Sequence, residues 1–349
     1  MRLKNVLENM AVMHGISADL PEADDPMFEL AAANLLERIE DAWCRTGHVS
    51  HSILFRSRPR EKEERMDMIA VIGDVHGDLE LLRALVQGIE EEARSRPARL
   101  TISSVGDLID RGPSSADVIE FVVRRGIQCV SGNHELWLHQ LAVEREFDDF
   151  ALKPFMGGAA TLESYGFEKP WTDSNLRDQV VSRIPFEHRE FLRRRQLLRV
   201  YEIGVGAFER TILLSHGGIS RAALTKLRHD LRSLPEIDLM SDIDLMEVAL
   251  RVEPRWGSQI LWGSTKLKDQ AIMPGVYSVS GHVPYATPGL LGAGSGAAIA
   301  VDTGCATAYD RKLSAVVFLS SHTEAPNQAF FLSVSRSEGL VRSQTVTLP

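Results

Sequence analysis

The sequence predicts an α/β fold, and three observations support this class. Short apolar runs rich in β-branched residues alternate with longer segments of helical periodicity, a pattern typical of strands joined by crossover connections. Every run ends in a glycine beside a polar residue, which lets the chain turn tightly where a buried strand stops. The chain has 349 residues, 44% of them hydrophobic and 25% charged, as in globular proteins with a full core. The runs are MIAVIG, LTISSVG, IQCVSG, TILLSHG, VYSVSG and AAIAVDTG.

Residues 1–65 are predicted to form an N-terminal helical extension followed by a charged linker. Apolar residues recur every three or four positions between Pro26 and Cys44, and Asp25 precedes them as a candidate cap, which indicates a helix. The linker is the charged stretch RSRPREKEER, residues 56–65. Residues 66–349 are assigned to one larger domain.

This larger domain is expected to carry a mostly helical insertion at about residues 136–210. Within it, EHREFLRRRQLLRV, from Glu187 to Val200, predicts a helix. Its arginines would form either a solvated basic face over the sheet or a patch that binds substrate. His139 is expected to pack or lie at the surface, and His188 to face solvent.

The composition excludes several functional classes. The net charge is −9 without a long basic block, so we expect no nucleic-acid binding. The cysteines Cys44, Cys129 and Cys305 form no CxxC pair and predict neither a disulfide framework nor a thiolate zinc site. No run approaches the ~20 apolar residues of a membrane span, and the N-terminus lacks a signal-peptide pattern. We therefore expect a soluble, cytoplasmic protein without a membrane partner.

Side chains that can bind metals follow the predicted strands. In open α/β sheets, ligands bind beyond the carboxyl ends of the strands, so these side chains are expected to converge. Each motif alone is more typical of a polar turn, but five in order, each after an apolar strand, predict a metal site. The residues are Asp74 and His76 in GDVHG, Asp107, Asp110 and Arg111 in GDLIDRG, Asn133 and His134 in GNHE, His216 in SHGG, and His282 in SGHVP.

The mixture of carboxylate, imidazole and amide groups suits Mn²⁺, Fe or Zn²⁺ better than Ca²⁺. Two such ions about 3.5–4 Å apart can share a bridging carboxylate and activate a hydroxide as the nucleophile. We expect two divalent ions, with Mn²⁺ favoured and Fe or Zn²⁺ as alternatives. Asp78 follows the first motif and is expected to cap the next helix.

The ordered motifs GDVHG, GDLIDRG, GNHE, HGG and GH resemble the calcineurin-like metallophosphoesterase superfamily, specifically its phosphoprotein phosphatase family and the bacterial serine/threonine phosphatases within it. GGAATLESYG, SGHVPYATP and VDTG add to the resemblance, which covers roughly Met66 to Leu319. It implies a four-layer α/β/β/α sandwich, with residues 66–349 as the catalytic domain and a binuclear metal centre at the carboxyl edge of the sheet.

The resemblance also implies roles for individual residues. His134 would be the general acid that protonates the leaving alkoxide, with Asp110 orienting its ring. Arg111 would clamp the phosphate with its planar fork, and Asn133 would also contact substrate. The implied metal ligands are Asp74 and His76 on the first ion, Asp107 bridging both, and Asn133, His216 and His282 on the second.

One departure from the family pattern concerns a second phosphate-binding arginine. In the family it usually follows a tryptophan between the last two histidine ligands. Here that segment reads RWGSQILWGSTKLKDQ, and no arginine lies between Trp262 and His282. Arg255 or Lys266 would have to substitute, and lysine offers a point charge instead of a bidentate fork.

Three functional hypotheses follow. The leading one is a dimetal phosphomonoesterase that hydrolyses phosphoserine, phosphothreonine and small aryl phosphates, with a metal-bound hydroxide as nucleophile and His134 as acid. The alternative is a hydrolase of dinucleoside polyphosphates such as diadenosine tetraphosphate; Asp110 favours the first, because some relatives that cleave dinucleotides differ at that position. A catalytically silent metal-binding scaffold is the third. The sequence does not define the oligomeric state.

Overall fold

The computed structural model describes residues 52–57, 66–96, 98–232, 240–252, 255–306, 312–320 and 327–349. The helix predicted between Pro26 and Cys44 and residues 58–65 of the linker lie outside them, so the domain boundary at residue 65 stays a prediction. The chain forms two compact units. The larger contains the described residues between Leu54 and Arg221 and between Ser258 and Pro349, and the smaller contains residues 52–53 and the described residues between Ala222 and Gly257.

A seven-stranded sheet carries the first metal-site motifs. Strands β2, β3 and β4 run parallel, with Ile72 opposite Ser104 and Ser104 opposite Cys129, so the loops that follow them start at one edge. The other strands are antiparallel to their neighbours. The order is β12-β11-β10-β2-β3-β4, with β13 on β11. The strands are β2 (Met66–Ile72), β3 (Ala98–Ser104), β4 (Gln128–Cys129), β10 (Leu313–Ser320), β11 (Gln328–Ser335), β12 (Gly339–Arg342) and β13 (Val346–Thr347).

A six-stranded sheet, ordered β1-β5-β6-β7-β9-β8, carries the last two motifs. Here β6, β7 and β9 run parallel, and Leu214 lies opposite Val279, so the loops after β6 and β7 also begin side by side. The strands are β1 (Ser52–Ser57), β5 (Gln196–Ile203), β6 (Arg210–Ser215), β7 (Val276–Ser280), β8 (Gly289–Ala293) and β9 (Gly296–Ala300).

The two sheets pack face to face through an apolar core. In β2, Ile69 and Val71 belong to this core, whereas Met68 and Ile72 belong to a second core on the helical side of the sheet. Because successive strand residues face opposite sides, a strand buried on both faces reads as the continuous apolar run seen in the sequence. Complete burial of each such side chain stabilises the fold by about 1.5–3 kcal/mol.

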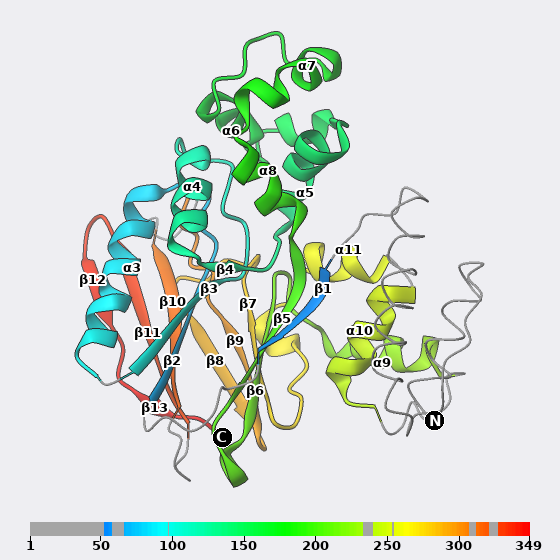
Figure 1. Cartoon of the computed structure of the whole chain (residues 1–349). Coiled ribbons are helices and arrows are strands. Elements are labelled where there is room, and N and C mark those ends of the chain that lie inside the picture. Colours follow the sequence, from blue (N-terminus) through cyan, green and yellow to red (C-terminus); the bar gives the residue numbers. More distant parts are fainter. Residues whose placement is uncertain are drawn as a thin grey trace, which may run out of the picture. The chain divides into compact units, whose positions relative to one another are not determined.

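Helices complete the layers. Helix α3 (Leu79–Arg94) contacts β3, β10 and β11 and buries Leu82, Leu85 and Ile89 along one stripe (Figure 1). Its N-terminus is capped as expected, because the Asp78 carboxylate accepts a hydrogen bond of 3.1 Å from the Leu81 amide. The other helices are α4 (Ser115–Arg125), α5 (Asn133–His139), α6 (Gly158–Ser164), α7 (Asp173–Arg183), α8 (Phe186–Arg193), α9 (Arg221–Asp230), α10 (Asp242–Val252) and α11 (Arg255–Trp262), with short π or 3₁₀ turns at Gln140–Glu144, Asp149–Leu152, Gly206–Phe208 and Leu267–Asp269.

The expected α/β class is confirmed: two sheets pack together and are flanked by helices. Among the described residues, no helix combines the length and apolar composition needed to cross a bilayer.

The helix predicted from Glu187 to Val200 is wrong in its second half. Helix α8 ends at Arg193, and β5 begins at Gln196 as an interior strand of the six-stranded sheet. Pairing with β6 and burial of nearly every β5 side chain outweigh the local helical pattern. As a result, Arg195 and Arg199 are buried and do not form a solvated face.

Two histidine predictions have opposite outcomes. His139 is packed as expected, with Nδ1 3.0 Å from the Leu192 carbonyl. The expectation that His188 faces solvent is wrong, since only 3% of it is exposed. Its ring lies between the Tyr165 hydroxyl, at 2.9 Å, and the Glu120 carboxylate, at 2.8 Å, which satisfy both nitrogens in the interior.

Candidate metal centre

The loops after β2, β3, β4, β6 and β7 bring their polar side chains together at the carboxyl ends of the parallel strands. Two groups of three side chains have potential ligand atoms within 4.8 Å of one another. The groups are His76, Asp107 and His134, and Asp107, His216 and His282.

Asp107 belongs to both groups. Its Oδ2 lies 3.7 Å from Nε2 of His76 and 3.7 Å from Nε2 of His134. Its Oδ1 lies 3.3 Å from Nε2 of His216, whose Nε2 is in turn 3.2 Å from Nδ1 of His282. The two carboxylate oxygens thus face different histidines, which is the arrangement a bridging ligand requires.

Backbone carbonyls fix the orientation of two of the rings. Nδ1 of His76 lies 3.0 Å from the Ile109 oxygen, and Nδ1 of His216 lies 2.9 Å from the Val105 oxygen. A carbonyl only accepts, so each Nδ1 carries a proton and each Nε2 is the nitrogen that faces the centre. Nε2 of His216 also faces Oδ1 of Asn133 at 3.0 Å, so electron-rich atoms converge on one region.

Asp74 has a buried carboxylate oxygen that a bound cation could contact. Its Oδ2 accepts a hydrogen bond of 3.0 Å from the His282 amide, but its buried Oδ1 has no hydrogen-bond partner among the described residues. A Cβ on Gly281 would come within 2.0 Å of that oxygen, so only glycine leaves its surroundings open. Burial, and then the nearby Asp302 carboxylate, raise the pKa of Asp74 well above its ordinary value. Divalent cations fit this donor set because they relieve such crowding of buried carboxylates.

The pKa values of two histidines at the centre shift in opposite directions. Burial alone would lower the pKa of His216, but the Asp107 carboxylate outweighs it and raises this pKa to about 10. In contrast, burial and then the positive charge of His216 lower the pKa of His282 to about 4. The centre therefore favours one positive charge beside Asp107 even when only protein groups are considered.

Glu135, in the same GNHE motif, was not predicted as a site residue. Its carboxylate accepts hydrogen bonds from the backbone amides of Asp107 at 2.9 Å, Leu108 at 2.7 Å and Gly132 at 2.8 Å. These bonds hold the loop after β3 against the start of α5. One sequence pattern could have identified Glu135: a glutamate three residues after the helix cap can accept a hydrogen bond from the backbone amide of the cap residue.

Left-handed backbone conformations concentrate in these loops. Non-glycine residues with positive φ cost about 1–3 kcal/mol each and cluster at functional sites. Of the six in the described chain, only Arg145 lies outside the loops that build the centre. The other five are His76 (φ 46°), Asp107 (50°), Asp110 (74°), Arg111 (65°) and His282 (66°).

His134 is held by a buried carboxylate. Nδ1 of His134 lies 2.6 Å from Oδ2 of Asp110, which also accepts a bond of 2.9 Å from Trp137 Nε1. The Thr161 hydroxyl donates to the other Asp110 oxygen at 2.6 Å. Burial alone would lower the pKa of His134, but Asp107 and then Asp110 outweigh it and raise this pKa. Trp137 and Thr161 were not identified from the sequence.

The guanidinium of Arg111 lies over the centre. Nη1 is 2.7 Å from His76 Nε2, Nη2 is 3.2 Å from His134 Nε2, and Nε donates to the Phe155 carbonyl at 3.3 Å. Arg111 also lines a cavity of about 710 Å³ together with His76, His282, Asp302, Lys153 and Phe155. Lys153 and Phe155 were not identified from the sequence.

Arg255 and Lys266 are the cations expected to replace the second phosphate-binding arginine. Arg255 begins α11, but its side chain lies outside the described residues, so its role stays a prediction. Lys266 is exposed and is not among the described residues that line the cavity, whereas Lys153 is.

Three aromatic side chains form a surface cluster beside this cavity. Phe155 is 60% exposed, and its ring lies 5.3 Å from that of Phe150, which lies 6.0 Å from that of Trp262. We call these residues the aromatic cluster.

Comparisons with known proteins agree with the geometry. The family model of the calcineurin-like phosphoesterases matches residues 68–285. The symmetrical bis(5'-nucleosyl)-tetraphosphatase of Klebsiella pneumoniae is 31% identical over 152 residues, and that of Enterobacter sp. is 30% identical over 152 residues. The match spans 43% of this chain and 43% of each relative.

Among solved structures, a metallophosphoesterase from Sphaerobacter thermophilus aligns with a TM-score of 0.34 at 16% identity, covering 73% of this chain and 86% of that one.

Proposed function

The chain belongs to the calcineurin-like phosphoesterase family and is a metal-dependent phosphoester hydrolase, and from that premise we propose that it cleaves dinucleoside polyphosphates of the diadenosine tetraphosphate type. The observation that carries the choice of substrate is the cavity that holds Arg111, Lys153 and the exposed ring of Phe155. Cations and an aromatic face in one cavity suit a ligand that joins phosphates to a nucleobase. The names of the two bacterial relatives support the same substrate class.

The family's divalent metal centre fits the residues after the strands. The donors would be Asp74, His76, Asp107, Asn133, His216 and His282, with Asp107 shared between two ions, and Mn²⁺ suits this set. When bound, such ions lower the pKa of water and neutralise phosphoryl oxygens.

Arg111 and Lys153 would bind the phosphate chain. The planar guanidinium of Arg111 can pair with two phosphoryl oxygens at once, and its Nε bond to the Phe155 carbonyl fixes the direction of the fork. Lys153 adds a point charge in the same cavity and would take the place of the second arginine of the family.

His134 would hold the proton for the leaving oxygen. Because Asp110 accepts from Nδ1, the proton that the protonated ring can transfer is the one on Nε2, which faces the centre. Trp137 and Thr161 fix the Asp110 carboxylate, so the ring cannot turn away. In the cleavage of a phosphoanhydride, His134 would transfer this proton to the departing nucleoside polyphosphate.

One observation favours phosphomonoesters such as phosphoserine as a second candidate. The alkoxide of serine is a poor leaving group and needs a proton, whereas a nucleoside diphosphate leaves more readily. A general acid as firmly positioned as His134 beside Asp110 therefore suits alkyl esters as well.

The test compares substrates on the Mn²⁺-loaded protein. Diadenosine tetraphosphate, a phosphoserine peptide and p-nitrophenyl phosphate are assayed side by side, with Asp107→Asn as the control for activity from this site. We expect the dinucleotide to be preferred and symmetric cleavage to give ADP alone. Preference for the phosphopeptide would contradict the proposal and support the second candidate.

A further inference from the structure

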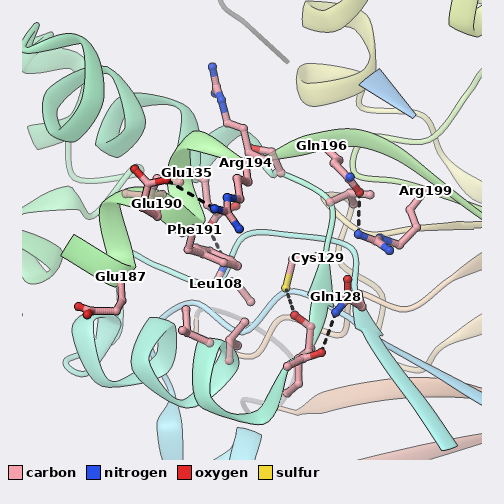
Figure 2. Close-up of a pocket in the computed structure, with 18 of the residues that line it drawn as sticks. Leu108, Gln128, Cys129, Glu135, Glu187, Glu190, Phe191, Arg194, Gln196 and Arg199 are labelled. Atoms are coloured by element: carbon pink, nitrogen blue, oxygen red, sulfur yellow. Dashed lines mark hydrogen bonds and ion pairs between the residues drawn. The ribbon is translucent and has the colours of Figure 1, made fainter. Parts of the chain in front are cut away.

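A second cavity, of about 700 Å³, lies among β4, α8 and β5 (Figure 2). A buried arginine, Arg195, is among the residues that line it. Arg195 lies between α8 and β5 and is only 5% exposed. None of its guanidinium nitrogens has a hydrogen-bond partner among the described residues. Buried charges in proteins are normally paired, so this side chain requires an explanation.

The acidic groups around the cavity do not provide the missing partner. The Glu135 carboxylate is occupied by three backbone amides of the metal-site loops. Glu190 lies 3.4 Å from Arg193 and 3.9 Å from Arg194. Glu187, the third acid in the lining, is exposed on α8. Among the described residues no carboxylate forms a direct ion pair with Arg195, although the nearby Glu144 and then Glu135 carboxylates act on its charge from a distance.

Arg199 brings a second guanidinium to the same cavity. It lies within β5, four residues after Arg195, lines the same cavity, and is also 5% exposed. Its Nη2 donates to Gln196 Oε1 at 2.7 Å, and Figure 2 shows this pair at the cavity wall. Two buried arginines in one cavity form a strong binding environment for an oxyanion.

We propose that this cavity binds a phosphate-type oxyanion, either free phosphate or the phosphate of a small nucleotide, with Arg195 as its principal ligand and Arg199 as the second. The cavity is also lined by Leu108 and by Glu135, whose carboxylate accepts from the amides of Asp107 and Leu108 and so holds their loop. An anion bound there contacts the far side of the segments that build the metal centre. The inference does not depend on which phosphate ester the enzyme cleaves.

The experiment measures thermal unfolding of the full-length, Mn²⁺-loaded protein against increasing sodium phosphate or AMP at constant ionic strength. Wild type is compared with Arg195→Met and with Arg194→Met, a control that removes an exposed arginine from the rim of the same cavity. Without added anion, Arg195→Met should melt at or above the wild-type temperature, because a buried unpaired charge is removed. Any rise in melting temperature that Arg195→Met still shows on adding anion is attributed to binding at the metal centre.

The proposal expects a saturable rise in melting temperature in wild type and Arg194→Met, of which a part is lost in Arg195→Met. If the rise that depends on Arg195 occurs at lower concentrations of AMP than of phosphate, the ligand is a nucleotide. If it occurs at lower concentrations of phosphate, the ligand is the free ion. Identical rises in all three proteins with both anions would overturn the proposal. If Arg195→Met does not fold, Arg195→Lys serves instead, with an apparent affinity weakened by about tenfold or more.

Discussion

The Asp110 carboxylate lies 2.6 Å from Nδ1 of His134, and both side chains are almost completely buried. This pair fixes which ring nitrogen carries the transferable proton. Asp110→Asn should therefore reduce kcat by about 10²–10⁴. The loss should be larger for a phosphoserine peptide than for p-nitrophenyl phosphate, whose leaving group departs without a proton. Steady-state kinetics on the two esters measure this difference.

The matched control for Asp110→Asn is Thr161→Ser, which keeps a hydroxyl beside the carboxylate and should change kcat little. Equal losses on both esters would show that Asp110 acts on the fold and not on the proton.

Gly281 should control metal binding. In Gly281→Ala the new Cβ would come 2.0 Å from Asp74 Oδ1, displacing the oxygen that has no protein partner. We expect at least about a tenfold loss of Mn²⁺ affinity by calorimetry. Gly292→Ala is the control, because its nearest neighbour is a proline side chain at 3.3 Å. Unchanged affinity in Gly281→Ala would remove Asp74 from the metal centre.

The aromatic cluster should bind the nucleobase. Phe155→Ala is expected to raise KM for diadenosine tetraphosphate by about fivefold to a hundredfold, corresponding to about 1–3 kcal/mol of stacking, and to leave KM for p-nitrophenyl phosphate nearly unchanged. Phe186→Ala, which removes an equally exposed ring from α8, should affect neither substrate. A parallel loss on both substrates would assign Phe155 to the fold of its loop.

Lys153 should act on the phosphate chain. Lys153→Met removes a positive charge from the cavity and keeps most of the apolar stem, so KM for the dinucleotide should rise by about three- to tenfold at low salt. The effect should shrink as salt is added, since screening weakens an exposed charge. Lys266→Met is the matched control, because Lys266 is also exposed but does not line the cavity. Equal increases in KM for Lys153→Met and Lys266→Met would contradict a specific role of Lys153 in binding the phosphate chain.

Acid should destabilise the protein in part through His139. Burial, and then the positive charge of Arg195, lower the pKa of His139 from 6.5 to about 3. Between these values the unfolded chain binds a proton that the folded chain does not. The stabilising contribution is therefore complete above pH 6.5 and falls, by up to about 1.4 kcal/mol per pH unit, as pH drops toward 3.

Urea unfolding of the metal-free protein at pH 7, 6 and 5 measures this contribution. His139→Gln should show a shallower loss of unfolding free energy with falling pH than wild type, whatever its stability at pH 7. Identical slopes would mean that His139 is protonated in the folded protein.

The convergence of the predicted donors could be read from the sequence because they come directly after buried strands, and their binding of metal stays a prediction. Asp74, Asp107 and His216 each follow an apolar run within a few residues, and parallel pairing brings those points together. Glu135 lay in a recognised motif, but its partners are backbone amides up to 28 residues away, which no local pattern reveals.

Arg195 and Phe155 show where sequence patterns fail. A run of arginines is typical of a solvated helical face, yet pairing of β5 inside a sheet buries Arg195. Phe155 lies in the insertion and is exposed. An exposed aromatic residue belongs to no hydrophobic repeat, so the sequence pattern does not identify it. In both cases tertiary contacts outweigh the local preference.

The substrate preference decides the proposed function, and it is measured by the ratio of kcat/KM for diadenosine tetraphosphate to that for a phosphoserine peptide. On Mn²⁺-loaded protein we expect this ratio to be at least about ten. Both activities should disappear in Asp107→Asn. A ratio below one, with activity still dependent on Asp107, would contradict the proposed function and identify a phosphomonoesterase.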